Sequence, residues 1–405
     1  MNLRRPLSHV GELSSKVGRV VVPRARIASA LGWTLVAVAA AAGTIGFALG
    51  WAELVALALG ATAILLVAVP FVIVRPVYDV RIELAAHRVR VGERAVGRLV
   101  VTGAGRRTSP ATRVELPVGV ARAEFRMPRL APGIEHDELF SVPTHRRAVL
   151  TLGPVTSVRS DPLGALRREV AWTEPELLYV HPRVIALDSE TTGILRDLEG
   201  LPTSDLADDD MSFHALREYA SGDDLRHVHW MSTARTQRLM IRQFEQTRRS
   251  HLLLVLSSDL DDYANDDEFE LAVSTVGSIG LAALRGGKDM TVITHDGTLA
   301  SRGARGFLDA LSGLEARSRA AGLTAPARAI AAAAPGASVV VFVTGGAGPL
   351  ADLRAASLRA PITARTVAVR AAGSEPAARR AIGDLAFVDV PELEALPQAM
   401  RAVSE

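Results

Sequence analysis

Two long runs without a charged residue, near the N-terminus, limit what this chain can fold into more than any other feature. Residues 27–52 contain no charged side chain, and after Glu53 residues 54–74 are again uncharged and rich in Leu, Val and Ala. Each run is long enough to cross a bilayer as a helix. Trp51 and Glu53 stand at the short turn between them, where an interface would lie. The pattern predicts a transmembrane hairpin at residues 27–75.

Two other interpretations of the apolar runs are weaker. A cleaved signal peptide is disfavoured because there are two runs, and each is longer than the apolar part of a signal peptide. Two buried core helices of a soluble protein are the second alternative.

Basic residues are placed asymmetrically around this hairpin. The connecting turn has none, whereas they precede the first run and follow the second: Arg4, Arg5, Lys16, Arg19, Arg24, Arg26, Arg75 and Arg81. The positive-inside rule then places both termini in the cytoplasm. We therefore expect a basic cytosolic tail at residues 1–26 and a cytosolic body after the hairpin, in a multi-pass protein of the inner or plasma membrane.

Composition excludes several classes of site. The 405 residues contain no cysteine, so disulfides, thiolate metal sites and cysteine nucleophiles are absent. The net charge is only +2, and lysine occurs only at Lys16 and Lys288, which indicates a genome rich in G and C, as in many bacteria, rather than a nucleic-acid-binding face. No dense basic patch with aromatic residues follows residue 30, so nucleic acid is not an expected partner.

The rest of the chain divides by its periodicity into three parts. Residues 76–185 hold short alternating segments separated by Gly and Pro, a pattern typical of a small antiparallel sandwich or barrel. Residues 251–405 alternate short apolar runs such as 252–256 with stretches of helical spacing, expected at about 269–284 and 307–317. That order predicts a doubly wound parallel sheet, an α/β fold.

Between these parts, residues 186–250 carry an unusual density of charges among aromatic and aliphatic residues. The residues of interest are Arg217, Glu218, Tyr219, Gly222, Asp223, Asp224, Arg226, Trp230, Arg235, Arg242 and Glu245. Burying many charges is costly unless they pair, so we expect one partly buried ion-pair network that also shapes a partner-binding surface. Removing Arg217 or Arg235 should then leave a carboxylate such as Asp223 or Glu218 unpaired and destabilise the protein strongly.

This segment resembles the signature of the domain of unknown function 58 family of bacteria. The family pattern of R-E-Y, G-D-D-x-R, a tryptophan, A-R-T and an acidic strand residue is matched by residues 217–219, 222–226, 230, 234–236 and 245. The resemblance implies a von Willebrand factor A-like domain at 251–405. It also implies association with a MoxR-type AAA+ ATPase, in the assembly or maturation of other complexes, including envelope-associated proteins.

The same resemblance raises the question of a metal site. Von Willebrand A domains often hold Mg²⁺ on a D-x-S-x-S motif, but here residues 257–261 read Ser-Ser-Asp-Leu-Asp, and Thr344 to Gly346 stand where another aspartate would be expected. Asp259 and Asp261 are therefore only weak metal candidates, with Mg²⁺ a weak possibility. We expect no required cofactor.

Sequence motifs for catalysis are missing. The chain has no P-loop, no H-E-x-x-H and no G-x-S-x-G. Asp223, Asp224, His227 and His229 could form a hydrolytic or metal-dependent site, which is the alternative hypothesis. The leading interpretation is a non-enzymatic, membrane-anchored scaffold or adaptor with no catalytic residue.

Overall fold

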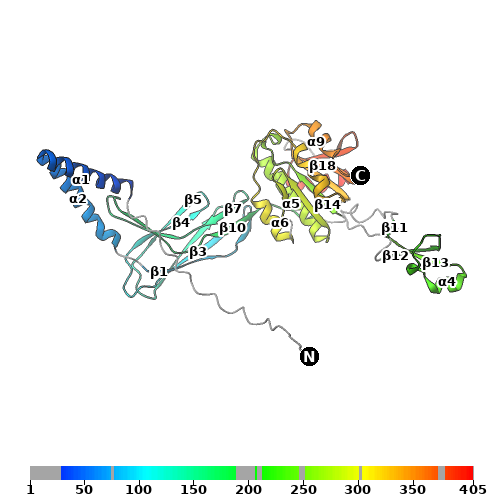
Figure 1. Ribbon diagram of the computed structural model, residues 1–405, viewed down its shortest axis with the longest axis horizontal. Helices are drawn as coiled ribbons and strands as arrows, with labels where there is room; N and C mark the ends of the chain where they lie inside the picture. The colour runs from blue at the N-terminus through cyan, green and yellow to red at the C-terminus, as the bar shows by residue number, and fades with distance from the viewer. Residues whose placement is uncertain are drawn as a thin grey trace, which may run out of the picture. The chain divides into compact units, whose positions relative to one another are not determined.

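The computed structural model describes residues 29–73, 77–187, 206–207, 212–245, 251–300, 303–372 and 379–404. The expected basic tail at 1–26 lies outside the described residues. The described chain contains two apolar helices, then a β-rich region, then an α/β unit, and this order confirms the coarse organisation expected from the sequence (Figure 1).

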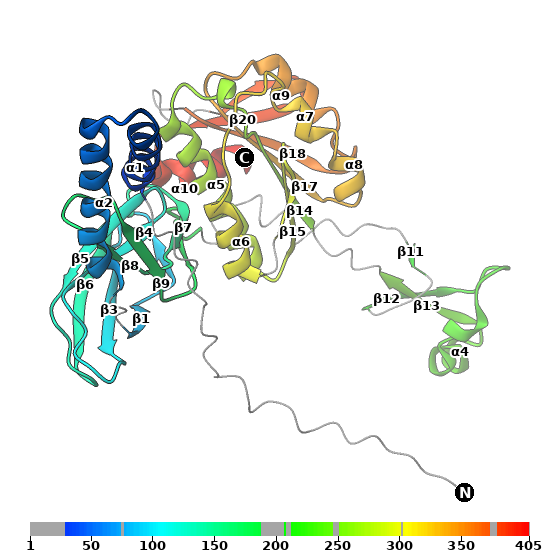
Figure 2. The same ribbon diagram turned by 60° about the vertical axis from the view of Figure 1, so that its left-hand side comes forward.

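The two apolar helices are α1 (Ala30–Leu49) and α2 (Ala52–Ile73), and they lie side by side in both views (Figure 2). Gly50 ends α1 in the left-handed conformation, with φ of 67°, and donates its N–H to Gly46. A side chain at Gly46 would lie 2.9 Å from the backbone nitrogen of Val55, so this glycine allows the helices to approach closely. Both helices are long and apolar enough to cross a membrane.

The β-rich region contains two sheets. In the first, β1 (Tyr78–Leu84), β3 (Ala95–Gly103) and β6 (Glu135–Val142) run antiparallel in the order β1-β3-β6. The second has the order β2-β10-β7-β4-β8-β9, with β5 paired to β4. Its strands are β2 (Arg88–Arg90), β4 (Thr112–Val118), β5 (Ala121–Met127), β7 (Ala148–Leu152), β8 (Thr156–Ser160), β9 (Arg167–Ala171) and β10 (Glu176–His181). In β3, Leu99 and Val101 are buried whereas Arg98 is exposed, which is the alternation of a sheet with one face in the core.

The α/β unit is built on one seven-stranded sheet. Its order is β16-β15-β14-β17-β18-β20-β19, and β14, β15, β17, β18 and β20 are parallel. The bounds are β14 (His251–Leu256), β15 (Asp289–Thr294), β16 (Gly297–Leu299), β17 (Val339–Gly345), β18 (Arg365–Ala371), β19 (Arg379–Ile382) and β20 (Leu385–Val390). Taken in chain order, the parallel strands are arranged 2-1-3-4-5, a doubly wound order whose direction reverses between β14 and β17.

Helices cover both faces of this sheet. One face packs on α5 (Asp266–Arg285), α6 (Gly303–Ser312) and α10 (Leu396–Ser404), and the other on α7 (Thr324–Ala327), α8 (Ile330–Ala333) and α9 (Leu350–Ser357). Leu252 and Leu254 enter the first core, whereas Leu253 enters the second, so β14 is apolar on both sides. The expected helix at 307–317 is wrong at its end: α6 stops at Ser312, and Arg317 instead pairs with the chain after β14.

A short segment at the start of β7, residues 145–149, also belongs to the α/β unit. Arg147 is 4% exposed in its side chain and forms an ion pair with Glu270 of α5, with Nε and Oε2 3.1 Å apart. Its Nη1 donates to the carbonyl of Leu311 at 2.9 Å, and its guanidinium lies 5.1 Å from the ring centre of Phe269. Nothing in the sequence pattern marked this arginine, because its partners follow it by more than a hundred positions.

Candidate functional site

The signature segment forms a small three-stranded sheet of its own. The order is β11 (Leu206–Ala207), β13 (Met240–Glu245), β12 (Ser212–Glu218), with antiparallel pairing. Between β12 and β13 the chain forms the short helix η1 (Leu225–His227) and then α4 (Trp230–Thr236). Val228 bridges to Ile241 of β13, and both are buried. The loop is therefore held against the strand by a small apolar contact and does not extend freely.

The charges of this segment form separate local pairs. Arg217 binds Asp223 with two hydrogen bonds of 2.7 and 2.6 Å, and Ala220 donates its N–H to the same carboxylate. Asp224 pairs with Arg226 at 2.8 Å. The Arg217 guanidinium keeps the pKa of Asp223 below its usual range, and Arg226 lowers the pKa of Asp224 to about 2.

These pairs are separate and so differ from the single network expected from the sequence, although the pair of Arg217 with Asp223 is partly buried as expected. The side chain of Arg217 is 36% exposed and that of Arg226 is 87% exposed. Glu218 pairs with Arg238, not with Arg235. Arg235 and Arg242 are exposed and have no ion-pair partner within the described residues. The expectation that Arg235 shields a buried carboxylate is therefore wrong, because Arg235 points into solvent from the last turn of α4.

Several expected residues have local structural roles. Gly222 adopts a φ of 110°, which a side chain would strain, at the turn before Asp223. His229 precedes α4, and its Nδ1 accepts a hydrogen bond from the N–H of Ser232, 3.3 Å away, so the ring caps the helix. His227 lies in η1, and Glu245 pairs with Ser212 across the sheet, although its side chain is outside the described residues.

Large apolar side chains are exposed on the same loop. Trp230 is 68% exposed and Met231 is 75% exposed at the start of α4, and Leu225 is 60% exposed in η1. Tyr219 is also exposed, at the end of β12. Such groups are usually buried in a soluble domain, and Trp, Tyr and Met are enriched at protein interfaces. We define the signature surface as Tyr219, Leu225, Trp230, Met231 and Arg235.

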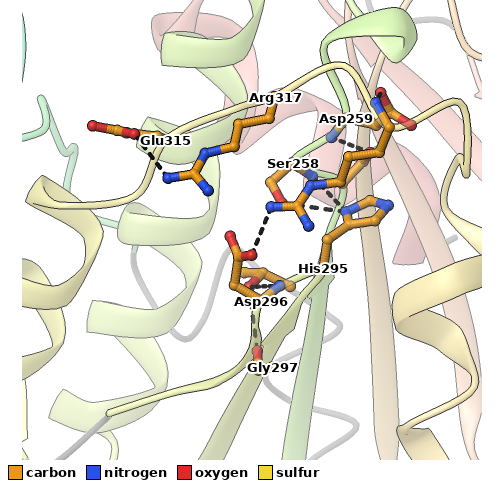
Figure 3. Close-up of polar contacts among 10 residues, drawn as sticks. Ser258, Asp259, His295, Asp296, Gly297, Glu315 and Arg317 are labelled. Atoms are coloured by element: carbon orange, nitrogen blue, oxygen red, sulfur yellow. Dashed lines mark hydrogen bonds and ion pairs between the residues drawn. The ribbon is translucent and has the colours of Figure 1, made fainter.

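A second cluster of polar residues lies at the carboxyl edge of the α/β sheet, where the strand order reverses (Figure 3). Asp259 follows β14 and is 1% exposed. Its carboxylate accepts backbone N–H groups of Arg319, Ala321 and Gly322 at 3.0, 2.8 and 3.2 Å, and one from Asp261 at 3.3 Å. Burial raises the pKa of Asp259, but these donors outweigh burial and leave the pKa below its usual value.

Asp262 holds the neighbouring loop. It is 3% exposed, its carboxylate accepts the hydroxyl of Ser257, and its backbone carbonyl accepts the N–H groups of Ala347 and Gly348 at 3.1 Å each. Burial raises the pKa of Asp262. The hydroxyl of Tyr263 donates to the carbonyl of Ser257 at 2.6 Å. The edge thus joins the turn after β14 to the turn after β17 through buried hydrogen bonds.

His295, which follows β15, completes the edge and was not marked by any sequence motif. Its Nδ1 accepts the N–H of Ser258 at 3.0 Å, and its Nε2 lies 2.9 Å from the carbonyl of Gly322. An acceptor at Nδ1 and a donor at Nε2 describe a neutral imidazole. Next in the chain, Asp296 pairs with Arg319 at 2.6 Å.

The candidate metal ligands are occupied by these contacts. Asp259 is satisfied by backbone donors, and the exposed Asp261 accepts the hydroxyl of Ser318 at 3.0 Å. The described residues contain no group of three or more His, Asp or Glu side chains that could hold a metal ion. A cavity beside Asp262, lined also by Thr344, Asp352 and Arg370, has room for about one water molecule. Asp259 and Asp261 thus both accept hydrogen bonds from protein groups.

Solved structures give only weak likenesses to this chain. The CARDB domain of a Pyrococcus furiosus protein, in complex with di-metal ions, is 15% identical over 24% of this chain and 92% of its own, with a TM-score of 0.18. The putative ApaA protein of Bordetella pertussis is 16% identical over 26% and 94%, with a TM-score of 0.19. The sporulation control protein Spo0M of Bacillus subtilis is 13% identical over 31% and 54%, with a TM-score of 0.18. At such TM-scores the likenesses support no assignment.

The chain was also compared with curated proteins and with family models. The curated proteins gave no match. Residues 215–392 match the family described as "Protein of unknown function DUF58". The matched range contains the motif residues from Arg217 to Glu245 and most of the α/β unit. For this part of the chain, the match supports the domain of unknown function 58 family.

Proposed function

We propose that this protein is a membrane-anchored, non-enzymatic adaptor, and that its signature surface binds a partner protein. The observation that carries the proposal is the exposure of Trp230 and Met231, 68% and 75%, on a loop whose backbone is otherwise well fixed. Covering exposed aromatic and Met side chains with a partner stabilises the complex, because it removes apolar surface from water. Binding hot spots are enriched in Trp, Tyr and Arg.

The contacts below the signature surface support a binding role because they hold its shape. The N–H of His229 donates to the carbonyl of Met240 at 2.8 Å, and the N–H of Met240 donates to the hydroxyl of Thr233 at 3.0 Å. A loop fixed in this way loses little conformational entropy when a partner docks.

The anchor is proposed from α1 and α2. Their length and apolar composition support two membrane spans, and most of their side chains are exposed in the chain by itself, as for Phe47 at 80%. The basic residues before and after the spans favour a cytoplasmic body. The doubly wound strand order supports a domain of the von Willebrand A kind, with a carboxyl edge that does not depend on a metal.

The partner that we propose is a MoxR-type AAA+ ATPase, which the family resemblance implies, in the assembly or maturation of other complexes. The alternative, an enzyme centred on Asp223, Asp224, His227 and His229, has less support. The two carboxylates are paired with arginines and His229 caps a helix, so those three groups have structural partners.

Binding of the ATPase by variants of the full chain tests this proposal. The chain would be placed in lipid nanodiscs, and its affinity for the purified MoxR-type ATPase of the same organism measured by interferometry, with and without ATP. Replacing Trp230 and Met231 together by alanine should weaken binding by about 30-fold or more, since a hot spot carries about 2 kcal/mol or more.

A matched control comes from the β-rich region. Leu139 lies on β6 and is 71% exposed, so Leu139→Ala removes a similar apolar side chain outside the signature surface. It should leave the affinity unchanged. If the parent protein did not bind the ATPase in either nucleotide state, the proposed partner would be wrong. If the double variant of Trp230 and Met231 bound as tightly as Leu139→Ala, the signature surface would not be the binding site.

A further inference from the structure

The β8–β9 hairpin contacts one end of each apolar helix, through its turn at residues 161–166 and through β9. Ser29, which caps the start of α1, donates its N–H to the carbonyl of Ala165 at 3.1 Å, and its hydroxyl lies 2.6 Å from the carbonyl of Gly164. Just after the turn, Arg168 donates through Nη1 to the carbonyl of Val72, in the last turn of α2, at 3.3 Å. The hairpin is therefore bound to the beginning of α1 by its turn and to the end of α2 by β9.

These contacts place the turn relative to the membrane if the helices span it. Ser29 and Val72 lie at the same end of the helix pair, because the connecting residues at Gly50 lie at the other end. A 20-residue helix is about 30 Å long, which matches the apolar thickness of a bilayer. The end that holds Ser29 and Val72 is then at the membrane surface, and the turn is there as well.

The turn is rigid and presents an apolar residue. Asp161 is 3% exposed and accepts the N–H groups of Leu163 and Leu166 at 2.9 and 2.6 Å. Leu163 is 62% exposed although it stands in a turn that its own hydrogen bonds fix in place. A fixed, exposed leucine at the level of the helix ends suits a membrane-surface contact, in which the apolar side chain enters the interface.

We propose that the β8–β9 turn is a membrane-contact site, with Leu163 inserted into the lipid interface. The partner is the bilayer itself, and the contact limits how the β-rich region can tilt on its two helices. The inference rests on the membrane anchoring proposed above and is independent of the ATPase partner.

Site-specific fluorescence in vesicles tests the contact, and the natural absence of cysteine makes single labels possible. The full-length Leu163→Cys variant would be labelled with nitrobenzoxadiazole and reconstituted in vesicles of phosphatidylcholine and phosphatidylglycerol. Some vesicles would carry a lipid with a doxyl quencher near the headgroup end of its acyl chain. We expect the label to lose fluorescence to that quencher.

Val120 provides the matched control. It is fully exposed in the β4–β5 turn, and the pairing of Arg113 with Val158 places it at the opposite end of the β4–β8 ladder. At the rise of a β-strand it lies ~30 Å from the β8–β9 turn. A label on Val120→Cys should show no quenching.

A third label separates the contact from the anchor itself. Leu57 is 53% exposed in α2, and a label on Leu57→Cys should be quenched by a doxyl group deeper in the acyl chain. If that label is quenched but the Leu163→Cys label behaves like the Val120→Cys label, the contact is disproved while the anchor stands. If the Leu57→Cys label is not quenched, both ideas fail. Should Leu163→Cys melt below the parent, Pro162→Cys gives the same test from the adjacent exposed position.

Discussion

The α/β unit and the signature segment use charged residues in opposite ways. In the α/β unit, Asp259 and Asp262 are 1% and 3% exposed, and their partners are mainly backbone groups and a serine. In the signature segment the charges pair with one another near the surface: Arg226 is 87% exposed, and the pair of Arg217 with Asp223 is partly buried. Charge density in the sequence therefore does not show where charges support the fold.

The difference lies in what remains when a partner is removed. A buried carboxylate that is deleted leaves several backbone donors without an acceptor, and each such donor costs free energy. An exposed ion pair that is broken leaves two groups that water solvates again. We therefore expect variants of the α/β unit to change stability, and variants of the signature segment to change binding.

The largest loss of stability is expected for Arg147→Ala. The side chain is 4% exposed, and its removal leaves Glu270 without its ion-pair partner and takes one hydrogen-bond donor from the carbonyl of Leu311. Breaking a buried ion pair typically costs about 3–5 kcal/mol. Denaturant unfolding of the full chain in detergent, followed by circular dichroism, should show the α/β unit unfolding at a lower midpoint.

The adjacent arginine is the control for this prediction. Arg146 pairs with Asp266, but its side chain is 58% exposed. Arg146→Ala should leave the midpoint nearly unchanged, and equal effects of the two substitutions would contradict the distinction between buried and exposed charges.

Asp259→Ala should have the next largest effect. It removes the acceptor of four backbone N–H groups, three of which hold the turn at residues 319–322. We expect a loss of about 2–3 kcal/mol in the free energy of unfolding, since unsatisfied buried donors cost about 1–3 kcal/mol. Asp261→Ala, two positions away and exposed, should cost much less, and hydrogen exchange at Ala321 should increase only in Asp259→Ala.

The sequence predicted the elements of the α/β unit better than its polar contacts. The apolar run 252–256 had to be a buried strand, and alternation with helical spacing led to the doubly wound order that the structure has. The role of Asp259 was not predictable, because its donors come from residues 319–322 and any carboxylate at a strand end has the same local pattern. His295 and Arg147 were missed for the same reason.

In the signature segment, the sequence showed the right residues but neither their separation into local pairs nor the exposure of most of them. Pairing of Arg217 with Asp223 follows from their types and their closeness in the sequence, and the structure has that pair. Most of the expected burial was wrong, because burial depends on which distant parts of the chain pack over the segment. Short-range sequence patterns carry no information about such packing. The exposure of Trp230 was missed for that reason too, since an aromatic residue in a motif is more often buried.

A pH titration should separate the two buried aspartates, with a smaller effect than the deletions above. The pKa of Asp259 in the folded state is lowered, so its ionised form adds stability above the unfolded pKa of about 3.9, and this stability is lost as pH falls through the folded pKa. The pKa of Asp262 is raised by burial, so its contribution has the opposite sign. Its protonated form adds stability below the unfolded pKa, and this stability is lost as pH rises through the folded pKa.

Asp262→Asn tests the prediction that ionisation of Asp262 lowers stability as pH rises. The substitution keeps a polar group beside Ser257 but cannot ionise. From pH 4 upward, the parent should lose part of its stability that Asp262→Asn does not lose, as measured by melting temperature against pH. Parallel curves for the parent and the variant would show that Asp262 does not titrate in this range.

The smallest effect on stability is expected within the signature segment, at Arg235. This side chain is exposed, has no ion-pair partner within the described part of the chain, and follows Met231 by one helical turn on the same face of α4. Arg235→Ala should melt like the parent but bind the ATPase more weakly, because a guanidinium beside an apolar anchor can pair with an acidic group of the partner. Arg217→Ala should lower the melting temperature moderately, since it breaks the two hydrogen bonds to Asp223 in a partly buried setting. If Arg235→Ala instead melted well below Arg217→Ala, the arginine would have to be supporting the fold. The single buried network expected from the sequence would then describe this segment better than the separate, exposed pairs.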